Sequence, residues 1–377
     1  MKNFKILTIV GTRPELIKLS RVIAELDKHM NHFLVHTGQN YDYELNEIFF
    51  SEMEIRKPDH YLNIGAETVA KTIANVIEKS DEILAQEQPD AILILGDTNS
   101  CLCAIPAKRR KIPIFHMEAG NRCFDQRVPE EINRKIVDHI SDVNLTYTEH
   151  ARRYLVSEGV KPELVIKTGS PMKEVIGYYR EKILASDILA INNLTEKEYF
   201  VVSAHREENV DCEEKLTSLL LVLKQLYEKY NYPIIFSTHP RTRNRLEASK
   251  LFLELNRDVT FIKPLGLFDY LCLQKNSSCV LSDSGTLTEE ASLLNFPAVM
   301  IRDAHERPEG MDEAILLMAN LQQGRVLHAI STVMSQSDAG HFSSAKVADY
   351  QVDNVSSKMV RIILSYTDFV NKKVWFK

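Results

Sequence analysis

The stretch FKILTIVGTRPELIKLSRVIAELDKH, residues 4–29, decides the fold. Its first seven residues form a mostly apolar run, which is typical of a strand buried on both faces of a parallel sheet. Gly11 ends this run, and Pro14 suits the first turn of a helix. The apolar residues that follow recur at the spacing of one helical face: Leu16, Leu19, Ile23 and Leu26. A strand followed by an amphipathic helix is the repeating unit of an α/β protein.

The same alternation continues along the chain in two series. The first series has predicted strands at residues 4–10, 33–37, 91–95, 112–116 and 143–146, and the second at 199–203, 234–237, 259–262, 280–281 and 298–301. Since 377 residues also suit about two domains, we predict two Rossmann-like doubly wound domains, at residues 1–170 and 171–355. The boundary is expected within residues 168–194. A last helix, within residues 356–377, can close either domain and is expected to pack back on the first.

Composition excludes several classes of protein. The 46 lysines and arginines against 52 acidic residues give a formal net charge of −6, so no overall charge favours nucleic acid or an anionic membrane. No G-x-G triplet and no G-x-x-x-x-G-K motif occurs, which argues against a nicotinamide dehydrogenase or a P-loop kinase. The six cysteines form no C-x-x-C pair, and no stretch reaches the ~18 apolar residues of a membrane span. We therefore expect a cytoplasmic protein without a secretion signal, with reduced structural thiols.

Polar residues follow almost every predicted strand. Such segments stand at residues 9–13, 36–39, 96–100 and 116–122 in the first half, and at 203–209, 237–241, 282–290 and 302–309 in the second. Ligands of open parallel sheets bind outside the carboxyl ends of the strands. Two domains with such strand ends predict one ligand cleft between them.

Two of these segments suit an anion. In SDSGTLTEE, residues 282–290, Asp283 or Ser284 can cap a helix whose first amides bind phosphate, and Glu289 or Glu290 then lies in reach of a ribose. The alternative is a helix cap with no ligand. In GTRPE, residues 11–15, Arg13 can bind phosphate through two hydrogen bonds, although it can also be a solvated side chain.

Carboxylates dominate the strand ends of the first half. Asp97 and Glu118 each follow an apolar strand directly, where a merely solvated acid would be unusual. Glu130 and Glu131 follow Pro129 at a helix start, and for Glu131 we expect only solvent and the helix dipole as partners. His205 follows the first strand of the second series. Metal chemistry is disfavoured, because the histidines belong to different strand ends and no metal-ligand spacing occurs: His116, His205, His239 and His305.

At these residues the sequence resembles the non-hydrolysing UDP-N-acetylglucosamine 2-epimerase family. The motifs that carry the resemblance are GTRPELIK (11–18), GDT (96–98), HMEAG (116–120), PEEINR (129–134), AHREEN (204–209), DSGTLTEEA (283–291) and ERPE (306–309). The resemblance implies a GT-B-like pair of domains with a UDP-sugar in the cleft, commonly in a homodimer, and no cofactor or metal. Thr286 stands where the N-acetylglucosamine enzymes usually carry a second glycine, and NRCFDQRVPEE (121–131) replaces their usual Leu-Arg-Thr-Gly-Asp. GNRCFDQRVPEEINR (120–134) and HERPEGMDEA (305–314) look like the subgroup that makes UDP-N-acetyl-L-fucosamine for capsule or O-antigen synthesis. Residues 121–127 follow Glu118 closely and are expected to line the sugar pocket.

The resemblance also implies roles for individual residues. The catalytic set is Asp97, Glu118, Glu130 and His205. The residues expected to bind the UDP-sugar are Arg13, Lys18, Gln39, His239, Ser284, Gly285, Thr286 and Glu290. The chemistry expected is C2 epimerisation through elimination and re-addition of UDP. The alternatives are a UDP-N-acetylglucosamine 2-epimerase and, from another class, a GT-B glycosyltransferase.

Overall fold

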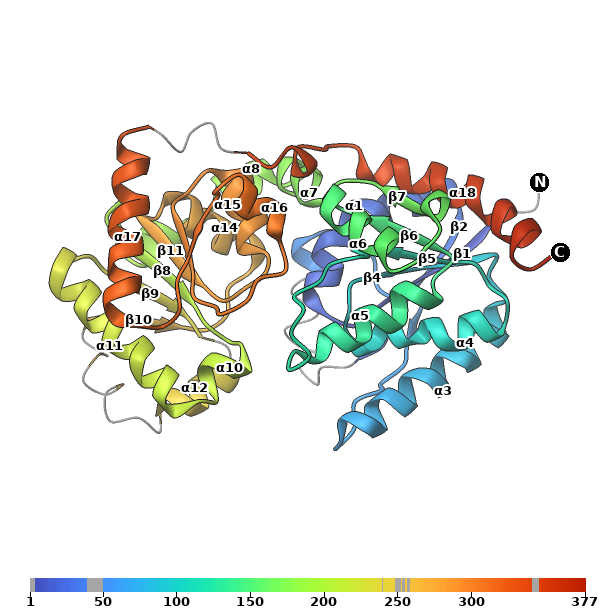
Figure 1. Cartoon of the computed structure of the whole chain (residues 1–377), viewed down its shortest axis with the longest axis horizontal. Helices are drawn as coiled ribbons and strands as arrows, with labels where there is room; N and C mark the ends of the chain where they lie inside the picture. The colour runs from blue at the N-terminus through green and yellow to red at the C-terminus, as the bar shows by residue number, and fades with distance from the viewer. Residues whose placement is uncertain are drawn as a thin grey trace. The chain divides into compact units, whose positions relative to one another are not determined.

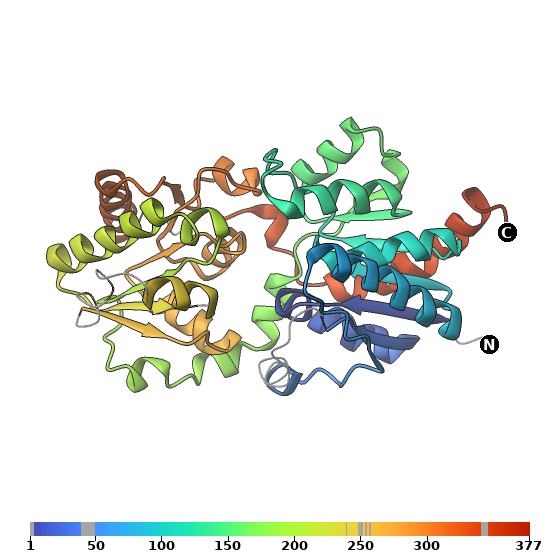
Figure 2. The same cartoon turned by 90° about the horizontal axis from the view of Figure 1, so that it is seen from below.

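The computed structural model describes residues 4–38, 50–238, 240–247, 252, 255, 258–340 and 346–377. The chain divides into two compact units: unit 1 is Met1–Gly177 with Ala348–Lys377, and unit 2 is Tyr178–Val347. Both chain termini therefore belong to unit 1 (Figure 2). In the described ranges, no helix has the length and the apolar character needed to span a membrane.

Unit 1 is built on a parallel sheet of seven strands. The strands are β1 (Lys5–Val10), β2 (Asn31–His36), β3 (His60–Tyr61), β4 (Ala91–Leu95), β5 (Ile114–Met117), β6 (Val143–Thr146) and β7 (Val165–Lys167). Their order across the sheet is β3-β2-β1-β4-β5-β6-β7. The order reverses direction between β1 and β4, and such a switch point is where open α/β sheets bind ligands.

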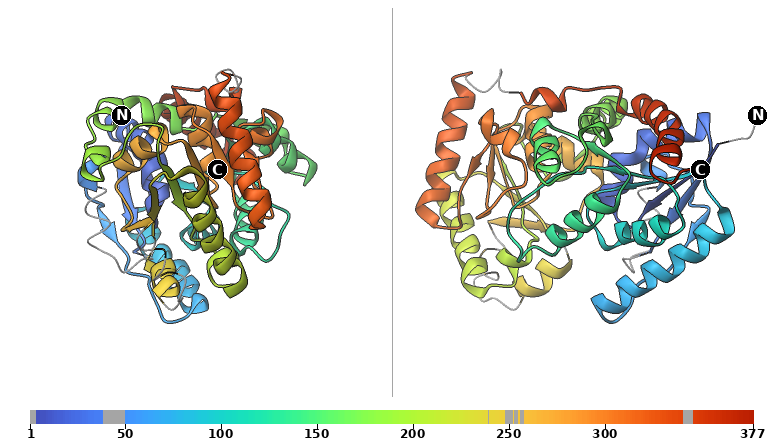
Figure 3. Two further views of the ribbon diagram at one scale, coloured as in Figure 1. Left: turned by 90° about the vertical axis from the view of Figure 1, so that its left-hand side faces the viewer. Right: turned by 45° about the vertical axis from the view of Figure 1, so that its right-hand side comes forward.

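Helices cover both faces of this sheet. They are α1 (Arg13–His29), α3 (Val69–Glu87), α4 (Ala104–Arg109), α5 (Pro129–Ile140), α6 (Glu149–Ser157), α7 (Met172–Tyr178) and the last helix α18 (Val355–Lys373), with 3-10 turns at Asn99–Cys103, Pro162–Leu164 and Ala348–Tyr350. Helices α1 and α18 pack against each other on one face, and α3, α4 and α5 lie on the other (Figures 1 and 3). An apolar cluster forms the core beside the sheet, where residues such as Leu7 and Ile92 of neighbouring strands are fully buried.

Unit 2 repeats the design with six parallel strands. These are β8 (Phe200–Ser203), β9 (Ile234–Ser237), β10 (Val259–Ile262), β11 (Cys279–Ser282), β12 (Ala298–Met300) and β13 (Leu317–Met318), in the order β10-β9-β8-β11-β12-β13. Its helices are α8 (Arg180–Leu184), α9 (Ile188–Ile191), α10 (Glu207–Val210), α11 (Glu213–Tyr230), α12 (Pro240–Glu247), α14 (Leu267–Asn276), α15 (Leu287–Leu294), α16 (Pro308–Asp312) and α17 (Gln323–Asp338). The switch point here lies between β8 and β11, and α11 packs with α17 over one face of the sheet (Figure 1).

The predicted fold class of two Rossmann-like α/β domains is confirmed. The units divide at residue 177, a few residues beyond the predicted end of the first domain, and α18 belongs to unit 1. The sequence did not predict the edge strands β3, β7 and β13, because two or three residues are too few to show a period.

Candidate active site

The loop that follows β1 is fixed by Glu15, in the first turn of α1. Its carboxylate accepts hydrogen bonds from the backbone N–H groups of Gly11 and Thr12. It also accepts one, at 2.7 Å, from the hydroxyl of Thr98 in the loop after β4. Burial raises the pKa of Glu15 to about 7 in spite of these hydrogen bonds. Glu15 therefore ties together the two loops at the switch point of unit 1.

Gly11 leaves no room for a side chain at this point. A Cβ atom there would lie 1.8 Å from Ser100 Oγ and 2.4 Å from Thr37 Oγ1. Arg13, a predicted phosphate ligand, is the first residue of α1 and is partly exposed. The glycine thus allows the end of β1 to approach Ser100 and Thr37 closely, and Arg13 follows it by two residues.

Glu118 stands directly after β5 in an unusual backbone conformation. Its φ of 62° is in the left-handed region, which a residue with a side chain rarely adopts. The carboxylate receives the ammonium group of Lys18, with Nζ 2.6 Å from Oε2 and 2.8 Å from Oε1. Both side chains are largely buried, and the Lys18 ammonium also lies 5.7 Å from the centre of the Tyr147 ring. Two predicted site residues from distant motifs are therefore joined in one ion pair.

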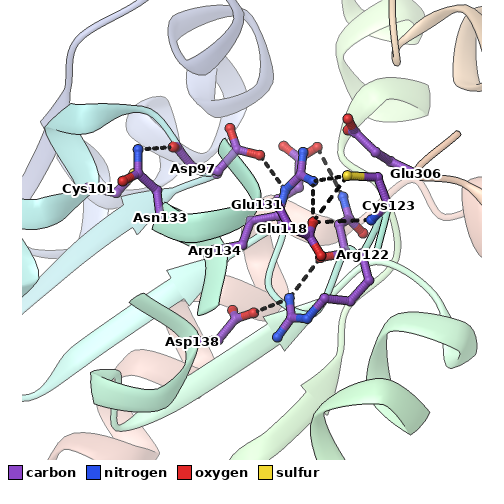
Figure 4. A network of polar contacts seen from close by, with 12 residues as sticks. Asp97, Cys101, Glu118, Arg122, Cys123, Glu131, Asn133, Arg134, Asp138 and Glu306 are labelled. Carbon is purple, nitrogen blue, oxygen red and sulfur yellow. Dashed lines mark hydrogen bonds and ion pairs between the residues drawn. The ribbon is translucent and has the colours of Figure 1, made fainter. Parts of the chain in front are cut away.

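Asp97, after β4, is held by two residues of α5. Arg134 Nε donates to Asp97 Oδ2 at 2.7 Å, and the Asn133 amide donates to the Asp97 backbone carbonyl at 2.9 Å (Figure 4). The Asp97 side chain remains 24% exposed, whereas Arg134 is 5% exposed. The carboxylate is thus oriented from its buried side and open on the other.

The expectation for Glu131 was wrong. Its side chain is buried, and it accepts hydrogen bonds from the Cys123 backbone N–H at 3.1 Å and from Arg134 at 3.0 Å (Figure 4). Burial alone would raise the pKa of Glu131, but these partners hold it below its ordinary value. Glu130, the neighbouring predicted catalytic residue, is only half-buried at the start of α5. The two adjacent glutamates therefore have different environments, and Glu131 is the one that anchors the loop after β5.

A second buried network lies beneath Glu118. His116 Nε2 donates to the Gly96 carbonyl at 2.7 Å, and its Nδ1 lies 3.0 Å from Asp138 Oδ1. Asp138 also receives Arg122 Nη1 at 2.7 Å. Burial lowers the pKa of His116, but Asp138 outweighs it and raises the pKa above its ordinary value, while the same contacts lower the pKa of Asp138. This network joins the end of β4 to the end of β5.

The segment after Glu118, expected to line a sugar pocket, is partly turned inward. The amide of Asn121 lies 3.5 Å from Glu118 Oε1, which keeps Asn121 beside the candidate catalytic carboxylate. Arg122 departs from the expectation, because it is fully buried and binds Glu158 through two hydrogen bonds of 2.6 and 2.8 Å. Phe124 is the opposite case, with 68% of its surface exposed.

The polar residues of α5 were missed as a group by the sequence analysis. Glu131, Arg134 and Asp138 follow one another at three- and four-residue spacing and are all buried. This spacing is that of the buried face of an amphipathic helix, on which charged residues are unusual. Charges on that face are the signal that could have identified them.

In unit 2, His205 is held by Asp283 of the loop after β11. Nδ1 of His205 lies 3.2 Å from Asp283 Oδ1, and the backbone N–H of His205 donates to both carboxylate oxygens at 3.1 Å. The Asp283 side chain is fully buried, while that of His205 is 41% exposed. The imidazole therefore lies at the surface of unit 2, in contact with the buried carboxylate of Asp283.

The suggestion that Asp283 or Ser284 caps the next helix was wrong for Asp283, whose carboxylate faces the loop after β8 instead. Helix α15 begins at Leu287, and its preceding residue is Thr286. The hydroxyl of Ser284 lies 3.0 Å from that of Thr286 and also accepts the Thr286 backbone N–H at 3.4 Å. The carbonyl of Gly285 accepts Arg307 Nε at 3.0 Å. Three predicted ligand residues thus form one compact turn.

The two glutamates of α15 have separate partners. Glu289 is fully buried and forms an ion pair with Arg307, 2.7 Å away. Glu290, also buried, accepts a hydrogen bond of 2.7 Å from the amide of Gln274. Both residues suggested for a ribose therefore lie inside the unit.

Two predicted binding residues, Gln39 and His239, lie outside the described residues. Over the ranges that the structure covers, no three His, Cys, Asp or Glu side chains gather in a way that could hold a metal ion. All six cysteines are free thiols, and only Cys212 among them is exposed.

Comparisons with known proteins agree on one family. The family model described as UDP-N-acetylglucosamine 2-epimerase matches residues 24–364. The UDP-2,3-diacetamido-2,3-dideoxy-D-glucuronate 2-epimerase of Pseudomonas aeruginosa is 32% identical over 359 residues, which cover 92% of this chain and 99% of that protein.

Two solved structures are similar over nearly the whole chain. The structure of UDP-N-acetylglucosamine 2-epimerase from Rickettsia bellii has a TM-score of 0.94 and 57% sequence identity, and covers 100% of both chains. The Methanocaldococcus jannaschii UDP-GlcNAc 2-epimerase in complex with UDP-GlcNAc and UDP has a TM-score of 0.89 and 32% identity, over 96% of this chain and 100% of that chain.

Proposed function

The chain belongs to the UDP-N-acetylglucosamine 2-epimerase family and is thus a UDP-sugar 2-epimerase, which is an isomerase. Within this family we propose a specific substrate for it. The enzyme inverts C2 of UDP-2-acetamido-2,6-dideoxy-L-talose and forms UDP-N-acetyl-L-fucosamine, for capsule or O-antigen synthesis. A homodimer and a cytoplasmic location stay predictions.

The observation that carries this substrate is the segment after Glu118. Asn121 replaces the leucine usual in the N-acetylglucosamine enzymes, and its amide lies 3.5 Å from the Glu118 carboxylate. A change beside a candidate catalytic group affects the sugar rather than the uridine. The GTRPE and DSG motifs stay close to the family pattern, and the departure here is Thr286, directly after DSG. The sequence therefore differs mainly where a different sugar would be in contact.

UDP-N-acetylglucosamine is the second candidate substrate. The Rickettsia bellii protein, 57% identical to this chain, bears the name of that epimerase. The Pseudomonas aeruginosa relative is named for a different acetamido sugar, so the family includes more than one sugar specificity. Both candidates share one reaction, the inversion of C2 next to the carbon that bears UDP.

The proposed chemistry is elimination followed by re-addition. The C2 hydrogen has no neighbouring ring carbonyl, so its direct removal would give no stabilised anion. In the first step the C1–O bond breaks, and UDP leaves with the bonding electrons while a base takes the C2 proton. The C2–H electron pair becomes the C1–C2 double bond of a 2-acetamidoglycal. UDP then adds back to C1 as a proton is delivered to the opposite face of C2.

This chemistry needs acid–base groups on two faces and a clamp for the diphosphate. We assign the acid–base work to two members of the catalytic set Asp97, Glu118, Glu130 and His205. We assign diphosphate binding to Arg13, His239, Ser284, Gly285 and Thr286, and the ribose to Glu290, while Lys18 and Gln39 complete the binding set. A positioned acid or base typically contributes about 10²–10⁴-fold to a rate. The route requires no redox cofactor, because the carbons end in the oxidation states in which they began.

The test is to incubate the enzyme in D₂O with each UDP-sugar alone and to follow C2 by NMR. We expect deuterium at C2, with kcat/KM at least about tenfold higher for the 6-deoxy-L-talose sugar, since a site built around a methyl lacks groups for a C6 hydroxyl. A preference for UDP-N-acetylglucosamine would overturn the substrate. Two inert sugars would favour the glycosyltransferase alternative.

Variants sharpen this experiment. Asn121→Leu should reduce the preference for the 6-deoxy sugar. Arg127→Leu is the control, because the Arg127 side chain is 83% exposed and forms an ion pair with Asp125. Replacement of each catalytic residue by its amide, or of His205 by Gln, should lower turnover by at least about 10²-fold while UDP still binds. If two or more of the four keep normal turnover, the acid–base assignment is wrong.

A further inference from the structure

We propose that Asp283 is a positioning residue for His205, which fixes the imidazole so that Nε2 exchanges the proton with the sugar. The inference rests on the proposed function, since it concerns the histidine of that site. It starts from the contact between the two side chains, with Nδ1 of His205 3.2 Å from Asp283 Oδ1. This carboxylate was expected to cap a helix, and its surroundings do not fit that role.

The carboxylate of Asp283 is surrounded by donors from the loop after β8. The backbone N–H groups of His205 and Arg206 donate to it at 3.0–3.1 Å, and the amide of Asn209 donates at 3.1 Å. Asn209 is itself fixed by a bond of 3.0 Å to the Ile301 carbonyl. The loop that carries His205 is thus wrapped around one buried carboxylate at the switch point of unit 2.

A diphosphate cannot be the partner of Asp283. The side chain is fully buried, and its negative charge would repel a phosphate oxygen. Burial of an ionised carboxylate is costly unless hydrogen bonds satisfy it, and here the donors come from the His205 loop. The negative charge of Asp283 therefore interacts with the loop that carries His205.

The contact favours one of the two neutral forms of the His205 ring. An ionised carboxylate only accepts hydrogen bonds, so the Nδ1 that faces it is the protonated nitrogen in the neutral ring. Proton exchange with substrate then takes place at Nε2. The ring is 41% exposed, so a surface for that exchange exists. When Nε2 takes a proton, the carboxylate stabilises the imidazolium, as the aspartate of a serine protease triad does for its histidine.

Charged residues of the His205 loop also form ion pairs with residues of a neighbouring loop. Arg206 faces Glu306 at 3.8 Å, and the buried Arg302 lies 3.4 Å from Glu208. These pairs involve the same loop but leave Asp283 as the carboxylate in contact with the imidazole.

The primary measurement is the tautomer of His205 in the unmodified enzyme. Long-range ¹H–¹⁵N NMR spectra of protein labelled with ¹⁵N-histidine distinguish the two neutral tautomers, and the spectrum of His205→Gln identifies the resonances of this residue among the 12 histidines. We expect the proton on Nδ1. A neutral ring with its proton on Nε2 would overturn the proposal, whatever the activity of any variant.

Asp283→Asn tests the consequence for turnover. The amide keeps the size and one acceptor, but its NH₂ group facing the ring favours the wrong tautomer. We expect kcat to fall at least about 10²-fold with little change in KM, together with a change of tautomer. Normal kcat in a folded Asp283→Asn protein would refute the positioning role.

Asn209→Ala is the matched control, because it removes another partner of Asp283 from the same loop and leaves the charge. It should keep the Nδ1 tautomer and lose far less kcat than Asp283→Asn; an equal loss would mean that Asp283 only anchors the loop. His205→Gln distinguishes the role of His205 in the reaction from the positioning of its ring by Asp283. If the tautomer is as expected but His205→Gln has normal turnover, the role of His205 in the proposed function is wrong while the positioning by Asp283 stands.

Discussion

Glu15 gives a prediction in which the sign and the size both follow from the structure. In the native state this carboxyl is buried and its pKa is about 7, against 4.5 for an ordinary glutamate. Between these values the native state holds a proton that the unfolded chain has lost. The free energy of unfolding therefore falls as pH rises through this window, and it levels off above pH 7.

Glu15→Gln removes this dependence, because the amide keeps the shape of the protonated carboxyl and cannot ionise. With the two pKa values above, the easier ionisation of Glu15 in the unfolded chain lowers the free energy of unfolding by about 1 kcal/mol at pH 5 and about 3 kcal/mol at pH 8. The stability of Glu15→Gln relative to the natural protein should thus rise by about 2–3 kcal/mol between pH 5 and pH 8.

Urea unfolding at pH 5, 6, 7 and 8 measures this difference. The chain has one tryptophan, Trp375, which belongs to unit 1 together with Glu15, so its fluorescence follows the relevant unit. Glu67→Gln is the control, since it makes the same chemical change at an exposed residue of the same unit. A difference between Glu15→Gln and the natural protein that is equal at pH 5 and pH 8 would show that Glu15 ionises normally.

Three further predictions concern the strand ends. Gly11→Ala should lower the unfolding free energy of unit 1 by about 1–3 kcal/mol in the same fluorescence assay, because its Cβ would lie 1.8 Å from a buried hydroxyl oxygen; unchanged stability would contradict this contact. Lys18→Met should destabilise unit 1 by about 3–5 kcal/mol because the largely buried carboxylate of Glu118 loses the cation that faces it, and adding Glu118→Gln should restore stability but not turnover. Arg13→Ala and Glu290→Ala should each weaken UDP binding by about 1.5–3 kcal/mol in calorimetry, and unchanged affinity in both would remove them from the clamp.

The fold was predictable because its signal is local. Each buried parallel strand is a short apolar run and each covering helix has its own period, so the alternation could be followed without tertiary information. The edge strands β3, β7 and β13 escaped because two or three residues have no period. These residues form strands because they pair with a neighbouring strand, which is a tertiary effect.

Individual residues of the site were predictable from the sequence, but the contacts between them were not. The carboxylates Asp97 and Glu118 stood out because charge directly after an apolar strand is unusual. Their cations were not assigned to them, since Arg134 is 37 residues from Asp97 and Lys18 is 100 residues from Glu118. Asp283 was misread for the same reason: a local rule makes it a helix cap, whereas the sheet brings it beside a loop 78 residues away.

The charges at the strand ends of unit 1 indicate how the proposed reaction would be divided. Three carboxylates, those of Asp97, Glu118 and Glu131, form ion pairs there with two cations, Lys18 and Arg134, so carboxylates outnumber cations in these ion pairs. Such a cluster repels a diphosphate and stabilises positive charge that develops at C1 when UDP leaves. The diphosphate must then be held by groups outside the cluster, which Arg13 and the Ser284–Thr286 turn can supply. The charge balance thus supports the assignment of the unit 1 carboxylates to the sugar and of phosphate binding to residues outside the cluster.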